Sequence, residues 1–175
     1  RATLGSRSVA LTNPDFSGSW STSELSSVNI INRDEKPKIA SLGSGWGDKI
    51  SILQRSDKVE IERVVFVPRE VQPLVTYHYS LNGSNTENSI NMGRTSRPAV
   101  SSTKWEENRL VITTLYPYQD RVKKDWHESK MIQTLWLEAA TGMPWEPRLI
   151  VETSRVGIPG GLTSTIRTVY TKGYR

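Results

Sequence analysis

The stretch "PLVTYHYSLNG", residues 73–83, predicts a β-strand that ends in a tight turn. Val75, Tyr77 and Tyr79 alternate with smaller or polar residues, which is the period-two pattern of a strand with two different faces. Asn82-Gly83 closes the stretch, and Asn-Gly beside alternating residues is a strong hairpin signal. We therefore expect the chain to turn back here and to continue as a neighbouring antiparallel strand.

The same period recurs along the rest of the chain, whereas the 3.6-residue period of a helix is nearly absent. We count about ten such segments, separated by turn residues at the regular spacing of an all-β domain. The clearest of them are "KVEIERVVFV" (58–67), "RLVITTLY" (109–116), "SKMIQTLWLEAATG" (129–142) and "LTSTIRTVYTKG" (162–173). Short turns between them favour up-and-down order, in which each strand pairs with the next.

These strands predict an antiparallel up-and-down β-barrel of about 8–10 strands, because closing the sheet removes its exposed edges. Some segments, such as "TENSINMG" (86–93), are polar on both faces, which suits a barrel whose interior is partly wet. We expect an N-terminal arm over residues 1–14 and one domain over 15–175. The stretch 24–47 breaks the pattern and is expected to form a flap between the first two strands.

The composition excludes several classes of function. The chain has 175 residues, 35% of them hydrophobic, which is enough for one domain. It has no cysteine, so disulfides and thiolate metal sites are excluded. The net charge is +5, but the basic residues are scattered among acids, so we do not expect nucleic-acid binding. No run of about 18 apolar residues occurs, so we expect no membrane-spanning helix.

A series of short motifs follows one another along the chain. They are Gly18-x-Trp20 at the first strand, "YSLNG" (79–83), the hairpin "WEENRLVITT" from Trp105, "WLE" (136–138) and "VYTK" (169–172). In order and spacing they resemble secreted bacterial lipocalin-like proteins, a calycin-type group of β-barrels of mostly unassigned function. The group usually has aspartate where this chain has Asn82. The stretches 42–47 and 143–148 are not features of the group.

The resemblance implies a lipocalin-like barrel in which Trp20 packs across the closed end. It also implies secretion or a periplasmic location, with which a first residue other than methionine agrees. No catalytic residues can be transferred from the group. The function we expect first is therefore binding of a small, mostly apolar or aromatic molecule in the barrel cavity, by a monomer or homodimer without a cofactor.

The aromatic residues suit such a cavity. The chain has six Trp and six Tyr against two Phe, and Tyr and Trp combine a flat apolar face with one polar atom. We expect three tryptophans in the barrel core, namely Trp20, Trp105 and Trp136. Those in turn-like segments, which are Trp46, Trp126 and Trp145, are expected to cover the cavity mouth together with Asp48.

Trp46 lies at the centre of residues 42–48, which contain three glycines and are expected to move easily. We expect Trp46 to gate the mouth, against Trp145. The alternative is that Trp46 packs permanently into a groove outside the barrel.

Two alternatives stay open: a scaffold whose barrel is filled by side chains, and an enzyme that uses acid–base chemistry as an isomerase, cyclase or hydrolase. The residues of such an enzyme would be His78, Tyr77, Glu62 and Arg167. This requires His78 and Arg167 to point into one cavity with Glu62 or Glu152, and His78 points inward if its tyrosine neighbours face outward. His127, the other histidine, lies among acids in what we interpret as a solvated turn, and we expect no metal site.

Overall fold

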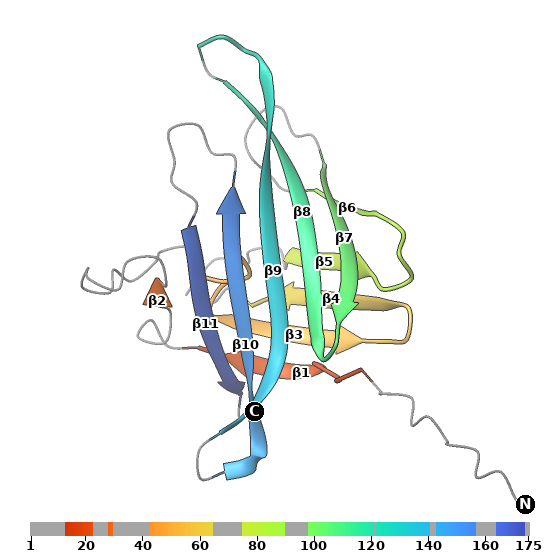
Figure 1. Cartoon of the computed structure of the whole chain (residues 1–175), viewed down its shortest axis with the longest axis vertical. Coiled ribbons are helices and arrows are strands. Elements are labelled where there is room, and N and C mark those ends of the chain that lie inside the picture. Colours follow the sequence, from red (N-terminus) through yellow and green to blue (C-terminus); the bar gives the residue numbers. More distant parts are fainter. Residues whose placement is uncertain are drawn as a thin grey trace, which may run out of the picture.

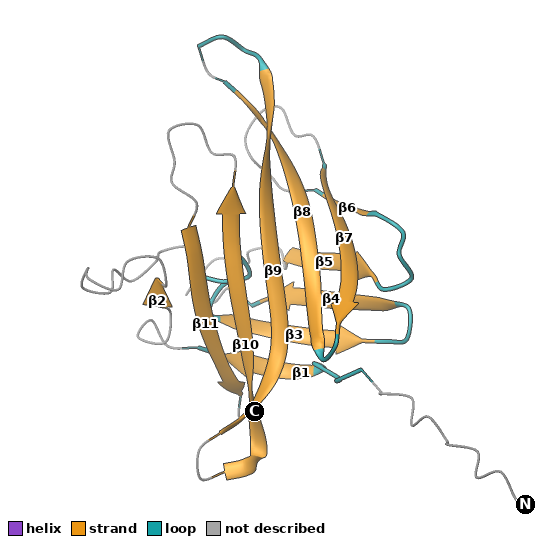
Figure 2. Cartoon of the chain, viewed as in Figure 1, coloured by secondary structure: helices purple, strands orange, loops and turns teal. Residues whose placement is uncertain are grey.

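The structure is a computed structural model of the chain and describes residues 13–22, 28–29, 43–64, 75–89, 98–120, 122–140, 143–156 and 164–173. All regular secondary structure in these ranges is β-strand (Figure 2). The described residues therefore contain no helix that is long and apolar enough to cross a membrane. The strands are β1 (Gly18–Ser21), β2 (Val28–Asn29), β3 (Lys49–Gln54), β4 (Lys58–Arg63), β5 (Val75–Ser80), β6 (Thr86–Asn88), β7 (Ala99–Glu106), β8 (Arg109–Gln119), β9 (Trp126–Ala140), β10 (Met143–Val156) and β11 (Ser164–Lys172).

The strands form one antiparallel sheet in the order β5-β4-β3-β1-β11-β10-β9-β8-β7-β6, and the two-residue β2 pairs with β11 beside this path. Except at β1, whose neighbours are β3 and β11, the described strands of the path follow their order in the chain. In Figure 1, β1, β3, β4 and β5 run across the molecule behind the steep strands β7 to β11. The predicted all-β, up-and-down, nearly closed barrel is confirmed, and a lipocalin-like fold is compatible with it.

The two ends of the sheet, β5 and β6, meet through side chains instead of a backbone ladder. The Asn88 amide donates to the His78 carbonyl oxygen at 2.9 Å and accepts from the His78 backbone N–H at 2.8 Å. Ser80 on β5 is held similarly, because its N–H donates to the Thr86 hydroxyl at 2.9 Å and its carbonyl accepts from the Thr103 hydroxyl. These bonds satisfy backbone groups of His78 and Ser80 at the edge of β5 and link the two ends of the nearly closed barrel.

Alternating residues of the strands point inward and pack into one core. Its fully buried members come from both groups of crossing strands, and they include Ile52, Val59, Ile61, Leu110, Ile112, Leu135, Leu149 and Val151. The period-two pattern of the sequence is thus the alternation between this core and the outer surface. At one end of the interior, Phe16 stacks on Trp105 with ring centroids 6.0 Å apart.

The Gly18-x-Trp20 motif belongs to this end of the barrel. Trp20 is buried, and its indole N–H donates to the Phe16 carbonyl oxygen at 2.9 Å. The Lys172 ammonium lies 4.5 Å from the centre of the Trp20 ring, on the neighbouring β11. Gly18 has φ of 138°, and a Cβ there would lie 2.6 Å from Lys172 Nζ. The motif therefore places a core tryptophan beside a backbone bend that favours glycine.

One expected core tryptophan lies elsewhere. Trp136 follows Leu135 on β9, and because Leu135 faces the core, Trp136 faces outward. Its ring lies 4.1 Å from the guanidinium of Arg109 and 5.6 Å from that of Arg167. The prediction that Trp136 fills the barrel interior is wrong. It is buried on the outer surface, where two arginines cover it.

Candidate functional site

Residues 43–47, which we call the inserted loop, enter the barrel interior. All three glycines of the loop have positive φ, at 45° for Gly43, 97° for Gly45 and 92° for Gly47, and residues with a side chain rarely adopt this conformation. Trp46 is 1% exposed and belongs to the core. Its indole N–H donates to the Tyr79 hydroxyl at 3.1 Å, and the two rings meet edge to face.

From the sequence we expected Trp46 to gate the cavity mouth, whereas the structure buries its ring in the core. In the alternative prediction Trp46 packs outside the barrel, but the ring lies inside it. The reason is that the indole fills apolar space and also finds a buried partner for its N–H.

Polar contacts fix the inserted loop to strands that are distant in the sequence. The Ser44 carbonyl oxygen accepts from the Gln133 amide at 2.6 Å and from the Thr153 hydroxyl at 3.0 Å. The Tyr170 hydroxyl donates to the Gly47 carbonyl at 2.6 Å and is 2.5 Å from the Ser44 hydroxyl. Burial raises the pKa of Tyr170 well above its ordinary value, so the hydroxyl remains a donor. The loop is thus held inside the barrel by side chains of β9, β10 and β11.

Beyond the inserted loop lies a region that we call the polar end. Its inward-facing residues are Tyr77, Ser101, Thr114, Tyr116, Met131 and Arg155. Tyr77, Tyr116 and Arg155 point inward and yet are partly exposed, so this end of the interior reaches solvent. At the apolar end, by contrast, Leu110, Leu135 and Leu149 are fully buried. Among the inward-facing side chains of the polar end, Tyr77, Tyr116 and Arg155 are therefore the ones that solvent partly reaches.

The polar end combines aromatic rings, a thioether and one cation. Tyr116 directs its hydroxyl to the Met131 sulfur at 3.9 Å, and burial raises the pKa of Tyr116 to about 12. Burial also raises the pKa of Tyr79, which lies beneath the polar end against Trp46. Tyr116 and Tyr79 are therefore both neutral near pH 7. Ser101 and Thr114 satisfy each other through a hydrogen bond of 2.7 Å.

Arg155 is the charged residue of the polar end. Every second residue of β10 faces the interior, as the buried Val151 and Thr153 show, and Arg155 is the next residue in this series. Its guanidinium therefore points inward. Burial lowers the pKa of this guanidinium, while the electrostatic influence of Tyr116 opposes the change. Its Nη1 is buried and has no hydrogen-bond partner, and no carboxylate of the described residues forms an ion pair with it. Gln133 Oε1 is also buried without a partner.

The four residues predicted for an enzyme are not brought together. Tyr77 faces the interior, because it pairs with the core residue Ile61. His78 therefore faces outward, with a 55% exposed side chain whose Nδ1 lies 3.7 Å from Glu60. Arg167 is outside on β11, where it binds Glu152 at 2.6 Å. The condition under which His78 would point inward, that its tyrosine neighbours face outward, is not met, because the tyrosines of β5 pack against the core.

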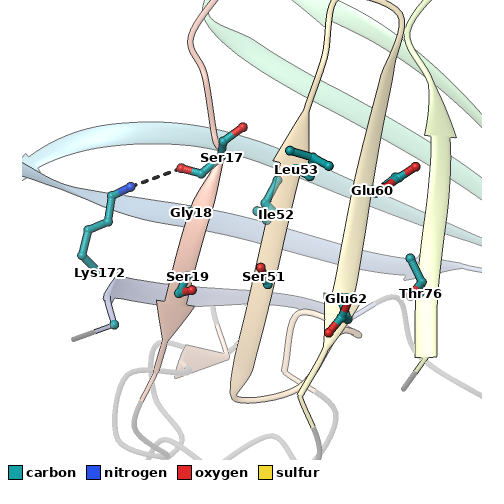
Figure 3. A pocket seen from close by; sticks show the side chains of 11 residues that line it. Ser17, Gly18, Ser19, Ser51, Ile52, Leu53, Glu60, Glu62, Thr76 and Lys172 are labelled. Carbon is teal, nitrogen blue, oxygen red and sulfur yellow. Dashed lines mark hydrogen bonds between the residues drawn. The ribbon is translucent and has the colours of Figure 1, made fainter. Parts of the chain in front are cut away.

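Glu62 lies on the outer face of β4 and lines a groove over β1, β3, β4 and β5 (Figure 3). The groove has a volume of about 670 Å³ and is lined by Ser17, Ser19, Ser51, Leu53, Glu60, Thr76 and Lys172 among others. The Lys172 ammonium donates to the Ser17 carbonyl at 3.2 Å. The sequence reasoning missed this groove, because its polar residues are those of an ordinary solvated strand face.

The residues predicted to cover one mouth also lie apart. Trp126 begins β9 and Trp145 lies in β10 near the other end of β9. β9 has 15 residues, so its ends are about 45 Å apart at about 3.3 Å per residue. One mouth cannot include both tryptophans. The side chain of Trp145 is outside the described residues, and Asp48 is an exposed residue whose carbonyl accepts from the Thr22 N–H at 2.8 Å.

Metal chemistry finds no support in the described residues, since these contain no group of three His, Asp or Glu side chains that could hold an ion. Comparison with known proteins gives no relative: no family model, no curated protein and no solved structure matches the chain.

Proposed function

We propose that the protein binds a small, mostly apolar or aromatic molecule at the polar end of the barrel. The observation that carries the proposal is the partial exposure of Tyr77 and Tyr116, which point inward, with Tyr116 beside Met131. Aromatic rings and a thioether offer flat, polarisable surface to an apolar ligand. The apolar end is occupied by buried side chains of the core, and Trp46 of the inserted loop packs with them.

The proposal includes a relationship to the secreted bacterial lipocalin-like proteins of calycin type, with a secreted or periplasmic location. It is supported by the order of the motifs and by the compatible antiparallel barrel. The enzyme alternative has lost its main support, because His78 and Arg167 lie on the outer surface.

A fluorescence titration tests the binding function. N-phenyl-1-naphthylamine is a neutral aromatic probe whose emission rises in apolar surroundings. We expect saturable binding, weakened about tenfold in Tyr116→Ala because an aromatic contact and its buried area are lost.

The matched control is Leu53→Ser, which changes the outer groove through a residue that is 46% exposed. We expect this variant to bind the probe as the unmodified protein does. Loss of binding in Leu53→Ser together with unchanged binding in Tyr116→Ala would place the probe in the outer groove and overturn the proposal.

A further inference from the structure

Two buried polar atoms of opposite hydrogen-bonding character belong to neighbouring inward positions of β9 and β10, one beside the inserted loop and one at the polar end. Arg155 Nη1 is a donor without an acceptor, and Gln133 Oε1 is an acceptor without a donor. Gln133 pairs with Thr153 and Arg155 pairs with Met131, so the two residues are diagonal neighbours on β9 and β10. Diagonal neighbours in a sheet lie about 7–8 Å apart, which their long side chains span.

The orientation of the Gln133 amide follows from its surroundings. Its Nε2 donates to the Ser44 carbonyl oxygen at 2.6 Å, and a carbonyl can only accept. The amide therefore cannot be turned around, and Oε1 is the atom left open. Gly45 lies beside this amide, since a Cβ at Gly45 would be 3.1 Å from Nε2.

Several other polar groups of this region already have partners. Thr153 donates to Ser44, and Ser101 and Thr114 bind each other. The Thr168 hydroxyl is also buried without a hydrogen-bond partner. Thr168 lies opposite Val151 of β10, nearer the apolar end, and is therefore separate from the two open atoms. Buried polar atoms of native proteins normally have partners, so the two open atoms need a group that accepts from one and donates to the other.

We infer that the bound molecule carries an anionic group with a hydrogen-bond donor beside it, as in an α-hydroxy carboxylate. This inference rests on the function proposed above. The carboxylate accepts from Arg155, and the hydroxyl on the neighbouring carbon donates to Gln133 Oε1. The aromatic or apolar body of the molecule lies against Tyr116 and Met131. No carboxylate of the described residues competes for Arg155, and the net charge of +5 favours approach of an anion.

Three molecules with the same ring and different head groups test this inference by calorimetry. They are 3-(indol-3-yl)propanol, which is neutral, indole-3-propionate, which is anionic, and indole-3-lactate, which adds the hydroxyl. We expect the propionate to bind about tenfold more tightly than the alcohol, because it gains a charge-assisted hydrogen bond. The lactate should bind about a further fivefold more tightly through Gln133.

Two variants assign these differences to residues. Arg155→Gln should abolish the preference for the anions, and Gln133→Met should abolish only the preference for the lactate over the propionate. Arg167→Gln, an arginine variant on the outer surface, should leave all three affinities unchanged. If Gln133→Met does not fold, the comparison of the lactate with the propionate in the unmodified protein still tests whether the added hydroxyl strengthens binding.

Equal affinity for the three molecules in the unmodified protein would overturn the inference and leave the proposed function intact. Preferences that persist in Arg155→Gln would also overturn it. If none of the three molecules binds and N-phenyl-1-naphthylamine does not bind either, the proposed function fails together with the inference.

Discussion

The two ends of the barrel interior differ in what their side chains contribute. At the apolar end, Phe16, Trp20 and Leu149 are buried, and Trp20 also satisfies its indole N–H internally. At the polar end, Tyr116 and Arg155 point inward but remain partly exposed, and Arg155 keeps an unpaired donor. In the function proposed above, the apolar end stabilises the barrel and the polar end binds the ligand. The predictions below test this division.

The largest effect is expected at the apolar end. Trp20→Ala should lower the free energy of unfolding by about 3–5 kcal/mol, because a large buried side chain is replaced by a cavity. Urea unfolding followed by circular dichroism measures the loss. A change below about 1 kcal/mol would show that this end does not carry the stability of the barrel.

The next largest effect is expected where β5 and β6, the two ends of the sheet, meet. Asn88→Ala removes both hydrogen bonds to the backbone of His78 and should cost about 2 kcal/mol, at about 1 kcal/mol for each bond. Hydrogen exchange of the His78 amide should become faster, while that of amides between β9 and β10 stays slow. Unchanged exchange at His78 would show that Asn88 does not close the barrel.

A smaller effect is expected at the polar end, where the free energy of unfolding should depend on pH through Tyr116. Burial raises the pKa of Tyr116 to about 12, above the value of about 10 in the unfolded chain. The contribution of this neutral phenol is therefore complete below about pH 10 and is lost as the pH rises from about 10 to about 12. Tyr116→Phe lacks this titration, so its free energy of unfolding should fall less steeply over that interval.

Tyr79 and Tyr170 are present in both proteins, so their titrations cancel in the comparison. Urea unfolding at several pH values measures the two slopes. Equal slopes would mean that the Tyr116 hydroxyl is not buried in the folded protein.

The smallest effect is expected for Arg155→Gln. The guanidinium is partly buried and has no carboxylate partner among the described residues, so its removal should change the free energy of unfolding by less than about 1 kcal/mol. Thermal and urea unfolding measure this. A loss as large as that of Trp20→Ala would show that Arg155 holds the fold and is not reserved for a ligand.

The sequence predicted the fold better than the site. The two-residue alternation of apolar and polar residues located the strands. In β4 it also assigned the apolar Val59 to the core and the charged Glu60 to the surface, because this assignment needs only neighbouring residues of one strand. The hairpin at Glu106–Asn108 lies where the sequence predicted it, between β7 and β8. For β5 the pattern grouped Tyr77 with Tyr79 but did not tell which face was inside, since tyrosine suits both.

The inserted loop could not be predicted, because its glycines fit a moving surface flap as well as a buried turn. The loop is a buried turn because Ser44 contacts Tyr170, 126 residues away, and because its carbonyl oxygen accepts hydrogen bonds from Gln133 and Thr153. Arg155 had no local signal either. It stands out only once its strand places it inward beside Tyr116 and Met131 without a carboxylate partner. Long-range pairing, and not local pattern, defines the candidate site.

The most direct test of the central claim uses the three methionines of the chain as reporters. The methyl groups are labelled with carbon-13, the Met131 signal is assigned with Met131→Leu, and N-phenyl-1-naphthylamine is titrated in. Met131 lies at the polar end, and Met143 begins β10 near the far end of β9. We predict that the Met131 methyl shifts saturably while the Met143 methyl stays in place. Saturable binding that leaves Met131 unmoved would contradict a ligand site at the polar end.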